Sequence, residues 1–133
     1  MKVDRIRLGL RLLLASAFLF AGYMHVVRPE VFVRIVPAWV PMPRDTVIAT
    51  GWCEIAGVIG LMIPQLRRIA AVLLALYAVC VFPANIKHAL DYAQHGGGIG
   101  WLYHGPRLLF QPVIVWWCLF AGGIIAWPSR SPK

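Results

Sequence analysis

Four long stretches of apolar residues follow one another along the chain and predict four helices. They cover residues 8–27, 46–63, 69–86 and 108–127. A bilayer core about 30 Å thick requires roughly 20 apolar residues per helix, and the second and third stretches lie near the short end of that range. The pattern therefore predicts an all-α integral membrane protein, a four-helix bundle that forms a single membrane domain over residues 1–133.

The connections between these stretches predict how the helices are arranged. The turn at residues 64–68 is short, so the second and third helices should be antiparallel neighbours. The segment at residues 28–45 is longer, and its four prolines prevent a regular spanning helix. Its apolar residues at 32, 35, 36 and 39 form a short amphipathic stripe at helical spacing. We expect a Pro-rich interfacial segment there, either a spacer or a lid over the outer mouth of the bundle.

Composition and charge agree with a lipid environment and suggest an orientation. Hydrophobic residues make up 60% of the chain and the mean hydropathy is +0.72, which leaves little surface for water. The net charge of +8 is expected to flank the helices, because no exposed basic cluster suggests nucleic-acid binding. Of the 13 Lys and Arg residues, eight would lie on the side of the N-terminus and the 64–68 turn. This bias predicts that both termini are cytoplasmic.

The first apolar stretch also has features of a signal peptide. It follows a basic start, and Ala15, Ser16 and Ala17 form a small-residue pattern typical of a cleavage site. The apolar run continues beyond this pattern to a length that spans a membrane. We therefore expect an uncleaved first helix.

A few polar side chains interrupt the apolar stretches, and Glu54 is the most informative. An ionisable residue in a membrane helix costs about 2.5–3.5 kcal/mol and is rare unless it faces a partner or a cavity. The other polar candidates fall in the same outer half of the predicted bundle: His25, Asn85, His88, Arg107 and Gln111. We expect these five to bind a ligand in one polar pocket, with Glu54 as the catalytic residue. The alternative is that Asn85 and Gln111 only hydrogen-bond to each other between helices.

Two local features favour a formed pocket. Pro83 lies inside the third helix and deprives the carbonyl of Val79 of its usual donor, so another group must supply one. The second helix carries Ala49, Cys53 and Gly57 at four-residue spacing, and small residues so spaced let helices approach closely.

Several short motifs together resemble the DoxX-like family of small bacterial membrane proteins. They are, in order, Ala21-Gly22 with His25, Pro29, residues 35–43, Gly51 with Glu54, residues 61–64, Arg67-Arg68, residues 81–85, residues 107–111 and Trp116-Trp117. The resemblance implies a four-helix bundle in the bacterial cytoplasmic (inner) membrane. It also implies an association with thiol- and quinone-linked redox systems, but it carries over no catalytic residues.

On these grounds we expect a redox-associated membrane subunit, linked to quinones or thiols. A quinone, the suggested cofactor, needs an apolar slot with a few polar groups at its head. The chain has no haem or flavin motif, so electrons would come from an oxidoreductase partner subunit. The alternatives are a small-solute carrier, which would require a homo-oligomer, and an outer-face metal-binding protein.

The metal and thiol alternatives depend on a few residues. His88, Asp91 and His95 would share one side of an extended third helix, but we expect them to be interfacial polar residues and no metal to be bound. The three cysteines lack a C-x-x-C spacing, so we expect packing roles for them. A pair between Cys53 and Cys80 stays open, since their helices are neighbours.

Overall fold

The chain folds into helices joined by short connections. The computed structural model describes residues 2–96 and 100–126. Over these residues it contains five helices and no strand: α1 (Lys2–Val27), α2 (Pro29–Val33), α3 (Pro43–Met62), α4 (Arg67–His95) and α5 (Trp101–Ala121). The all-α prediction is confirmed.

Three of the described helices are long and apolar enough to cross a membrane, namely α1 from Val3, α3 and α4. Helix α5 is not among them, because His104, Arg107, Gln111 and two prolines lower its hydropathy. The structure therefore supports a membrane protein, but it does not confirm a bundle of four spanning helices. The type of membrane and the cytoplasmic position of the termini stay predictions.

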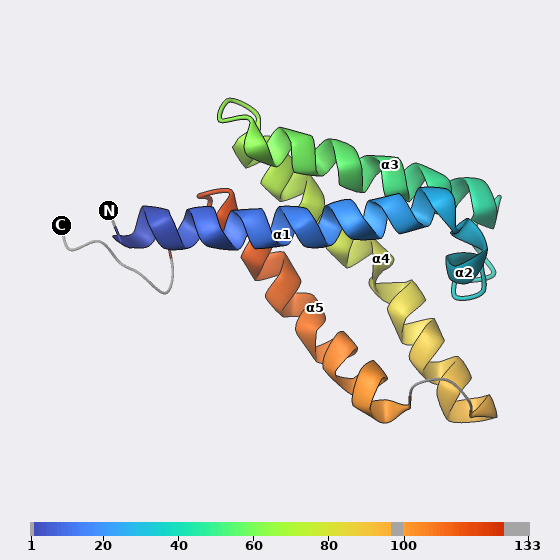
Figure 1. The fold of residues 1–133 in the computed structure, drawn as a ribbon. Coiled ribbons are helices and arrows are strands. Elements are labelled where there is room, and N and C mark those ends of the chain that lie inside the picture. Colours follow the sequence, from blue (N-terminus) through green and yellow to red (C-terminus); the bar gives the residue numbers. More distant parts are fainter. Residues whose placement is uncertain (1, 97–99, 127–133) are drawn as a thin grey trace.

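The long helices pack as two antiparallel pairs (Figure 1). Helix α1 lies along α3, and α4 lies along α5. The pairs are joined where α3 contacts α4 and where α5 contacts α1. As predicted from the short turn after Met62, α3 and α4 are neighbours that run in opposite directions.

The predicted helix boundaries were wrong mainly at the connection between α4 and α5. Helix α4 continues to His95 instead of ending at residue 86, and α5 begins at Trp101 instead of residue 108. Apolarity marks the depth of the membrane, whereas a helix continues as long as its residues tolerate the conformation. Gly96 follows the last residue of α4 as its C-cap, and its φ of 66° lies in the left-handed region that favours glycine.

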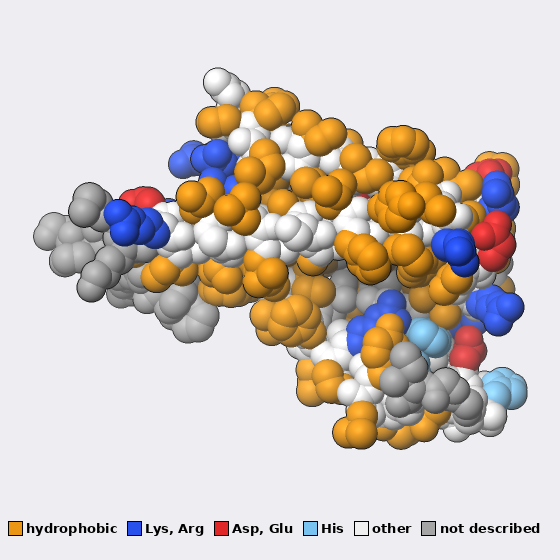
Figure 2. All heavy atoms as spheres, viewed as in Figure 1, with side chains coloured by type: hydrophobic (Ala, Val, Ile, Leu, Met, Phe, Trp, Pro, Cys, Tyr) orange, Lys and Arg blue, Asp and Glu red, His pale blue; other side chains and the backbone are white. Residues whose placement is uncertain are grey.

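The exterior of the protein is largely apolar between charged ends. Figure 2 shows hydrophobic side chains over most of the visible face of α1 and α3, with charged side chains near the two ends of these helices. On α4, Leu73, Leu76 and Val79 are each more than half exposed. A face of this kind is what lipid contact requires.

The other faces of the helices form a dense core near the N-terminal half of α1 and the α3–α4 turn. Leu14, Leu61, Leu74 and Cys118 are almost completely buried in it. Helices α3 and α4 touch closely here, because a Cβ atom on Gly57 would lie 2.5 Å from Leu74 and one on Gly60 would lie 2.9 Å from Ala70. Small residues thus bring these helices together as predicted for Gly57, whereas Cys53 is exposed.

Candidate functional site

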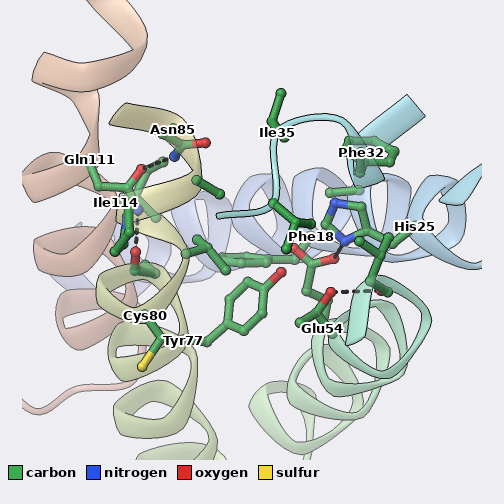
Figure 3. A pocket seen from close by; sticks show the side chains of 18 of the residues that line it. Phe18, His25, Phe32, Ile35, Glu54, Tyr77, Cys80, Asn85, Gln111 and Ile114 are labelled. Carbon is green, nitrogen blue, oxygen red and sulfur yellow. Dashed lines mark hydrogen bonds and ion pairs between the residues drawn. The ribbon is translucent and has the colours of Figure 1, made fainter. Parts of the chain in front are cut away.

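The other half of the protein contains a pocket of about 630 Å³ (Figure 3). Its walls come from α1, α3, α4, α5 and the segment that contains α2. Most lining side chains are apolar, such as Phe18, Val81 and Ile114. This size and character are typical of a site for a small organic molecule.

Five of the six predicted site residues line this pocket: His25, Glu54, Asn85, Arg107 and Gln111. His88 does not line it, but contacts Arg107 at its edge. The prediction that the polar residues gather in one half of the protein is thus matched by their positions, while their roles stay predictions.

The most unusual contact in the pocket joins His25 of α1 to Glu54 of α3. The Nδ1 atom of His25 lies 2.8 Å from Oε2 of Glu54, and the side chain of Glu54 is only 4% exposed. This separation is that of an ion pair, but the alignment of the two groups is not that of a hydrogen bond. A buried carboxyl group therefore faces a partially exposed imidazole at the pocket wall.

Two glycines bring this pair together. Gly22 lies one turn before His25 on α1, and Gly51 lies one turn before Glu54 on α3. A Cβ atom on Gly51 would lie 2.7 Å from the carbonyl oxygen of Gly22, and one on Gly22 would lie 2.8 Å from that of Gly51. Any larger residue would separate the two helices, so the approach of these backbones determines the distance between the ionisable groups.

Tyr77 of α4 completes this polar group and was missed by the sequence analysis. Its hydroxyl group points toward the carboxyl group of Glu54 (Figure 3), and it interacts with both Glu54 and Thr50. Two signals could have indicated the group: Tyr77 carries a hydroxyl in an otherwise aliphatic stretch, and Thr50 precedes Glu54 by one helical turn. The His25–Glu54 pair thus has a phenol and an alcohol beside it.

The Pro-rich segment at residues 28–45 forms one wall of the pocket. Phe32 of α2 packs edge-on against the His25 ring, with ring centroids 4.2 Å apart at an angle of 90°. Ile35, Val36 and Trp39 also line the cavity. The segment packs against the polar group, and whether it acts as a lid or as a spacer stays a prediction.

A second polar group links α4 to α5 on the opposite side of the pocket (Figure 3). Nδ2 of Asn85 donates a hydrogen bond to Oε1 of Gln111 at 3.1 Å, and Nε2 of Gln111 donates to the carbonyl of Ala78. The sequence predicted a donor for the carbonyl of Val79, whereas Gln111 donates to the carbonyl of Ala78, one residue earlier. This bond agrees with the alternative prediction that Asn85 and Gln111 hydrogen-bond to each other between helices.

Arg107 and His88 form a further link between α5 and α4. Nη1 of Arg107 lies 3.0 Å from Nδ1 of His88, and the guanidinium lies 5.4 Å from the centre of the Tyr103 ring. A guanidinium can only donate, so Nδ1 of His88 accepts and carries no proton. This arrangement holds Arg107 at the pocket wall.

The remaining polar residues of this region do not gather around a metal. Within residues 2–96 and 100–126, no group of three or more His, Cys, Asp or Glu side chains is placed to hold an ion. Asp91 pairs instead with Lys87 at 2.6 Å, and the ring of His95 contacts the backbone carbonyl of Asp91. His104, which the sequence analysis left unassigned, is buried and stacks on Tyr92 with ring centroids 5.0 Å apart.

The three cysteines form no disulfide with one another. All three are free; Cys118 is buried in the core, whereas Cys53 and Cys80 are exposed. The predicted packing role holds for Cys118, and the open possibility of a Cys53–Cys80 pair is not realised.

The fold and the pocket define an all-α membrane protein with a buried polar site. The family model described as "Domain of unknown function (DUF8561)" matches residues 14–121, and the chain belongs to this family. No curated protein and no solved structure matches the chain. The matched region contains every residue of the pocket described above.

The resemblance to the DoxX-like family was wrong, because the family found is a different one and no DoxX model matches. Most of the motifs that suggested it are short and include a Gly, a Pro, a Trp or a single polar residue. Such residues recur in unrelated membrane helices because glycine and proline are frequent there and tryptophan favours the interface. Their order along a short chain is therefore weak evidence of ancestry.

Proposed function

We propose that this protein binds a small amphipathic molecule within the membrane, in the pocket between its helices. The observation that carries the proposal is the His25–Glu54 pair, which is held together at the wall of a cavity of about 630 Å³. The polar head of the ligand would meet this pair, and its apolar body would lie along the aliphatic and aromatic walls.

A purely structural role explains this pair poorly. A carboxyl group in a membrane helix costs about 2.5–3.5 kcal/mol, and helices in lipid associate by packing small residues without such a group. Gly22 and Gly51 already provide that packing. The alignment also leaves Nδ1 of His25 and Oε2 of Glu54 without a well-formed hydrogen bond among the described residues. A ligand group placed between them and Tyr77 would supply one.

The chemistry of the walls defines the class of ligand. His25 and Tyr77 can donate a proton to an oxygen atom, and Glu54 can accept or return one. The amides of Asn85 and Gln111 bond to each other, so their side of the cavity does not require a hydrogen-bonding group from the ligand. A ring with hydrogen-bonding oxygens and an apolar tail has these properties, and a quinone is the first such ligand to test. In a redox role, an oxidoreductase partner subunit would supply the electrons.

Ligand-induced thermal stabilisation of the detergent-solubilised protein tests this proposal. A short-chain quinone should raise the melting temperature of the wild type, and Glu54→Gln should fold normally yet lose most of the rise. The matched control is Glu30→Gln, the same chemical change at a residue whose exposed carboxylate pairs with exposed Arg44 at 3.4 Å. Glu30→Gln should bind as the wild type does.

Three results would contradict the proposal or part of it. If neither a quinone nor any other lipophilic oxygen compound shifts the melting temperature, the cavity is not a ligand site of this class. If Glu54→Gln binds as well as the wild type, the carboxyl group belongs to helix packing. Binding of a compound without a hydrogen-bonding head would remove the role given to His25 and Tyr77.

A further inference from the structure

A second cavity, of about 540 Å³, lies at the opposite end of the protein. It is open to the surface and is lined by the start of α1, the α3–α4 turn and the end of α5, which meet there (Figure 1). The charged residues that line it are four arginines and one acid: Arg7, Arg11, Arg67, Arg68 and Asp4. Figure 2 shows Lys and Arg side chains near this end of α1 and of the α3–α4 pair.

The arginines are close enough to repel one another. The charges of both Arg7 and Arg67 act on Arg11, which is itself partly buried. Like charges gathered at a low-dielectric surface create a positive potential that concentrates anions. Asp4 offsets only part of this charge, so the cavity has an excess of positive charge.

Hydrogen bonds to backbone carbonyl groups hold three of the guanidinium groups in place. Nε of Arg11 donates to the carbonyl of Ala121 at 3.0 Å, at the C-terminal end of α5. Nε of Arg67 donates to the carbonyl of Leu61 at 3.2 Å, near the end of α3. A guanidinium has five N–H donors, so each of these groups keeps further donors for a ligand.

Arg7 is held in a similar way. Its Nη2 donates to the carbonyl of Ile125 at 3.1 Å, and its guanidinium lies 5.0 Å from the centre of the Phe120 ring. The Nε atom of Arg7 is buried and has no hydrogen-bond partner among residues 2–96 and 100–126. Arg7, which lines the cavity, thus has one donor without a partner among the described residues.

We propose that this cavity binds a phosphate group through Arg7, Arg11, Arg67 and Arg68. Planar guanidinium groups form paired hydrogen bonds with phosphate oxygens, which makes arginine the preferred residue for such recognition. Helix α4 begins at Arg67 without a side-chain cap or an acidic residue in its first turn, so its positive end adds to the attraction. The cavity lies at the ends of the spanning helices, where the phosphates of lipid headgroups are found.

The phosphate could belong to an anionic lipid or to a soluble molecule, and binding measurements on the full-length detergent-solubilised protein separate these sources. The first arm measures the affinity for phosphatidylglycerol against phosphatidylcholine by thermal shift and native mass spectrometry. The second arm titrates inorganic phosphate in the absence of lipid. A preference for phosphatidylglycerol identifies a lipid, whereas protection by inorganic phosphate alone identifies a soluble ligand.

Arg68→Gln is the decisive variant, because Arg68 is exposed and makes no hydrogen bond or ion pair with the described residues. Its loss should leave folding intact and weaken phosphate binding about fivefold, the effect of one basic residue near an anionic group. Arg5→Gln is the matched control, since Arg5 is also exposed on α1 but does not line the cavity. The proposal fails if both changes weaken binding equally, or if neither phosphatidylglycerol nor phosphate binds better than phosphatidylcholine.

Discussion

Close helix contacts have different consequences in the two halves of this protein. Near the α3–α4 turn, Gly57 and Gly60 let apolar side chains pack closely between α3 and α4, and Leu61 is completely buried. In the other half, Gly22 and Gly51 bring α1 and α3 equally close, yet the contact places His25 against Glu54 beside a cavity. The difference shows that small residues determine only the distance between helices. The side chains one turn away decide whether the contact produces a core or a site.

The packed half should show the largest effect on stability. Leu61→Ala should lower the free energy of unfolding by about 2–5 kcal/mol, because it leaves a cavity among fully buried neighbours. Unfolding in mixed detergent, followed by circular dichroism, measures this loss. Leu73→Ala is the matched control, since Leu73 is 58% exposed. An equally large loss for Leu73→Ala would show that the exposed face of α4 is covered by another protein molecule.

The helix contact beside the pocket comes next. Gly51→Ala places a Cβ atom 2.7 Å from the Gly22 carbonyl, so α1 and α3 must separate. Overpacking of this kind costs about 1–3 kcal/mol, and the ligand-induced thermal shift should disappear because His25 moves away from Glu54. Gly9→Ala is the control, because nothing lies within 4 Å of the added Cβ atom. If Gly51→Ala binds ligand as the wild type does, the spacing of the pair is not what the site requires.

Much of this architecture follows from the hydrophobic pattern, while the site follows only in part. The pattern predicted the helices and the half of the protein in which Glu54 and His25 lie, because depth in the membrane depends only on residue count. It could not predict that these two residues face each other, because that depends on the rotation of α1 against α3. Gly22 precedes His25 by three residues, and Gly51 precedes Glu54 by three residues. This shared spacing is the sequence feature that reflects the contact.

Tyr77 was missed for a different reason. A tyrosine in an apolar stretch is usually interpreted as an aromatic packing residue, and Tyr77 does contact the ring of Phe18, with centroids 6.2 Å apart. Only the three-dimensional arrangement shows that its hydroxyl group reaches Glu54 from a neighbouring helix. The part of α4 beyond residue 86 was not predicted, because polar residues can continue a helix where the apolar stretch stops.

The smallest expected effect concerns the amides on the far side of the pocket. Asn85 and Gln111 bond to each other at 3.1 Å. A double-mutant cycle of Asn85→Ala and Gln111→Ala should therefore yield a coupling energy of about 0.6 kcal/mol, and at most about 1.7 kcal/mol. These are the values found for hydrogen bonds between membrane helices. The cycle removes the separate contribution of the Gln111 bond to Ala78, because that bond is lost in the single and the double variant alike. Unfolding of the four proteins in mixed detergent measures the coupling, and the ligand-induced thermal shift should persist in Asn85→Ala. A coupling near zero together with loss of that shift would show that these amides bind the ligand. The binding surface would then be the whole cavity, not only its His25–Glu54 side.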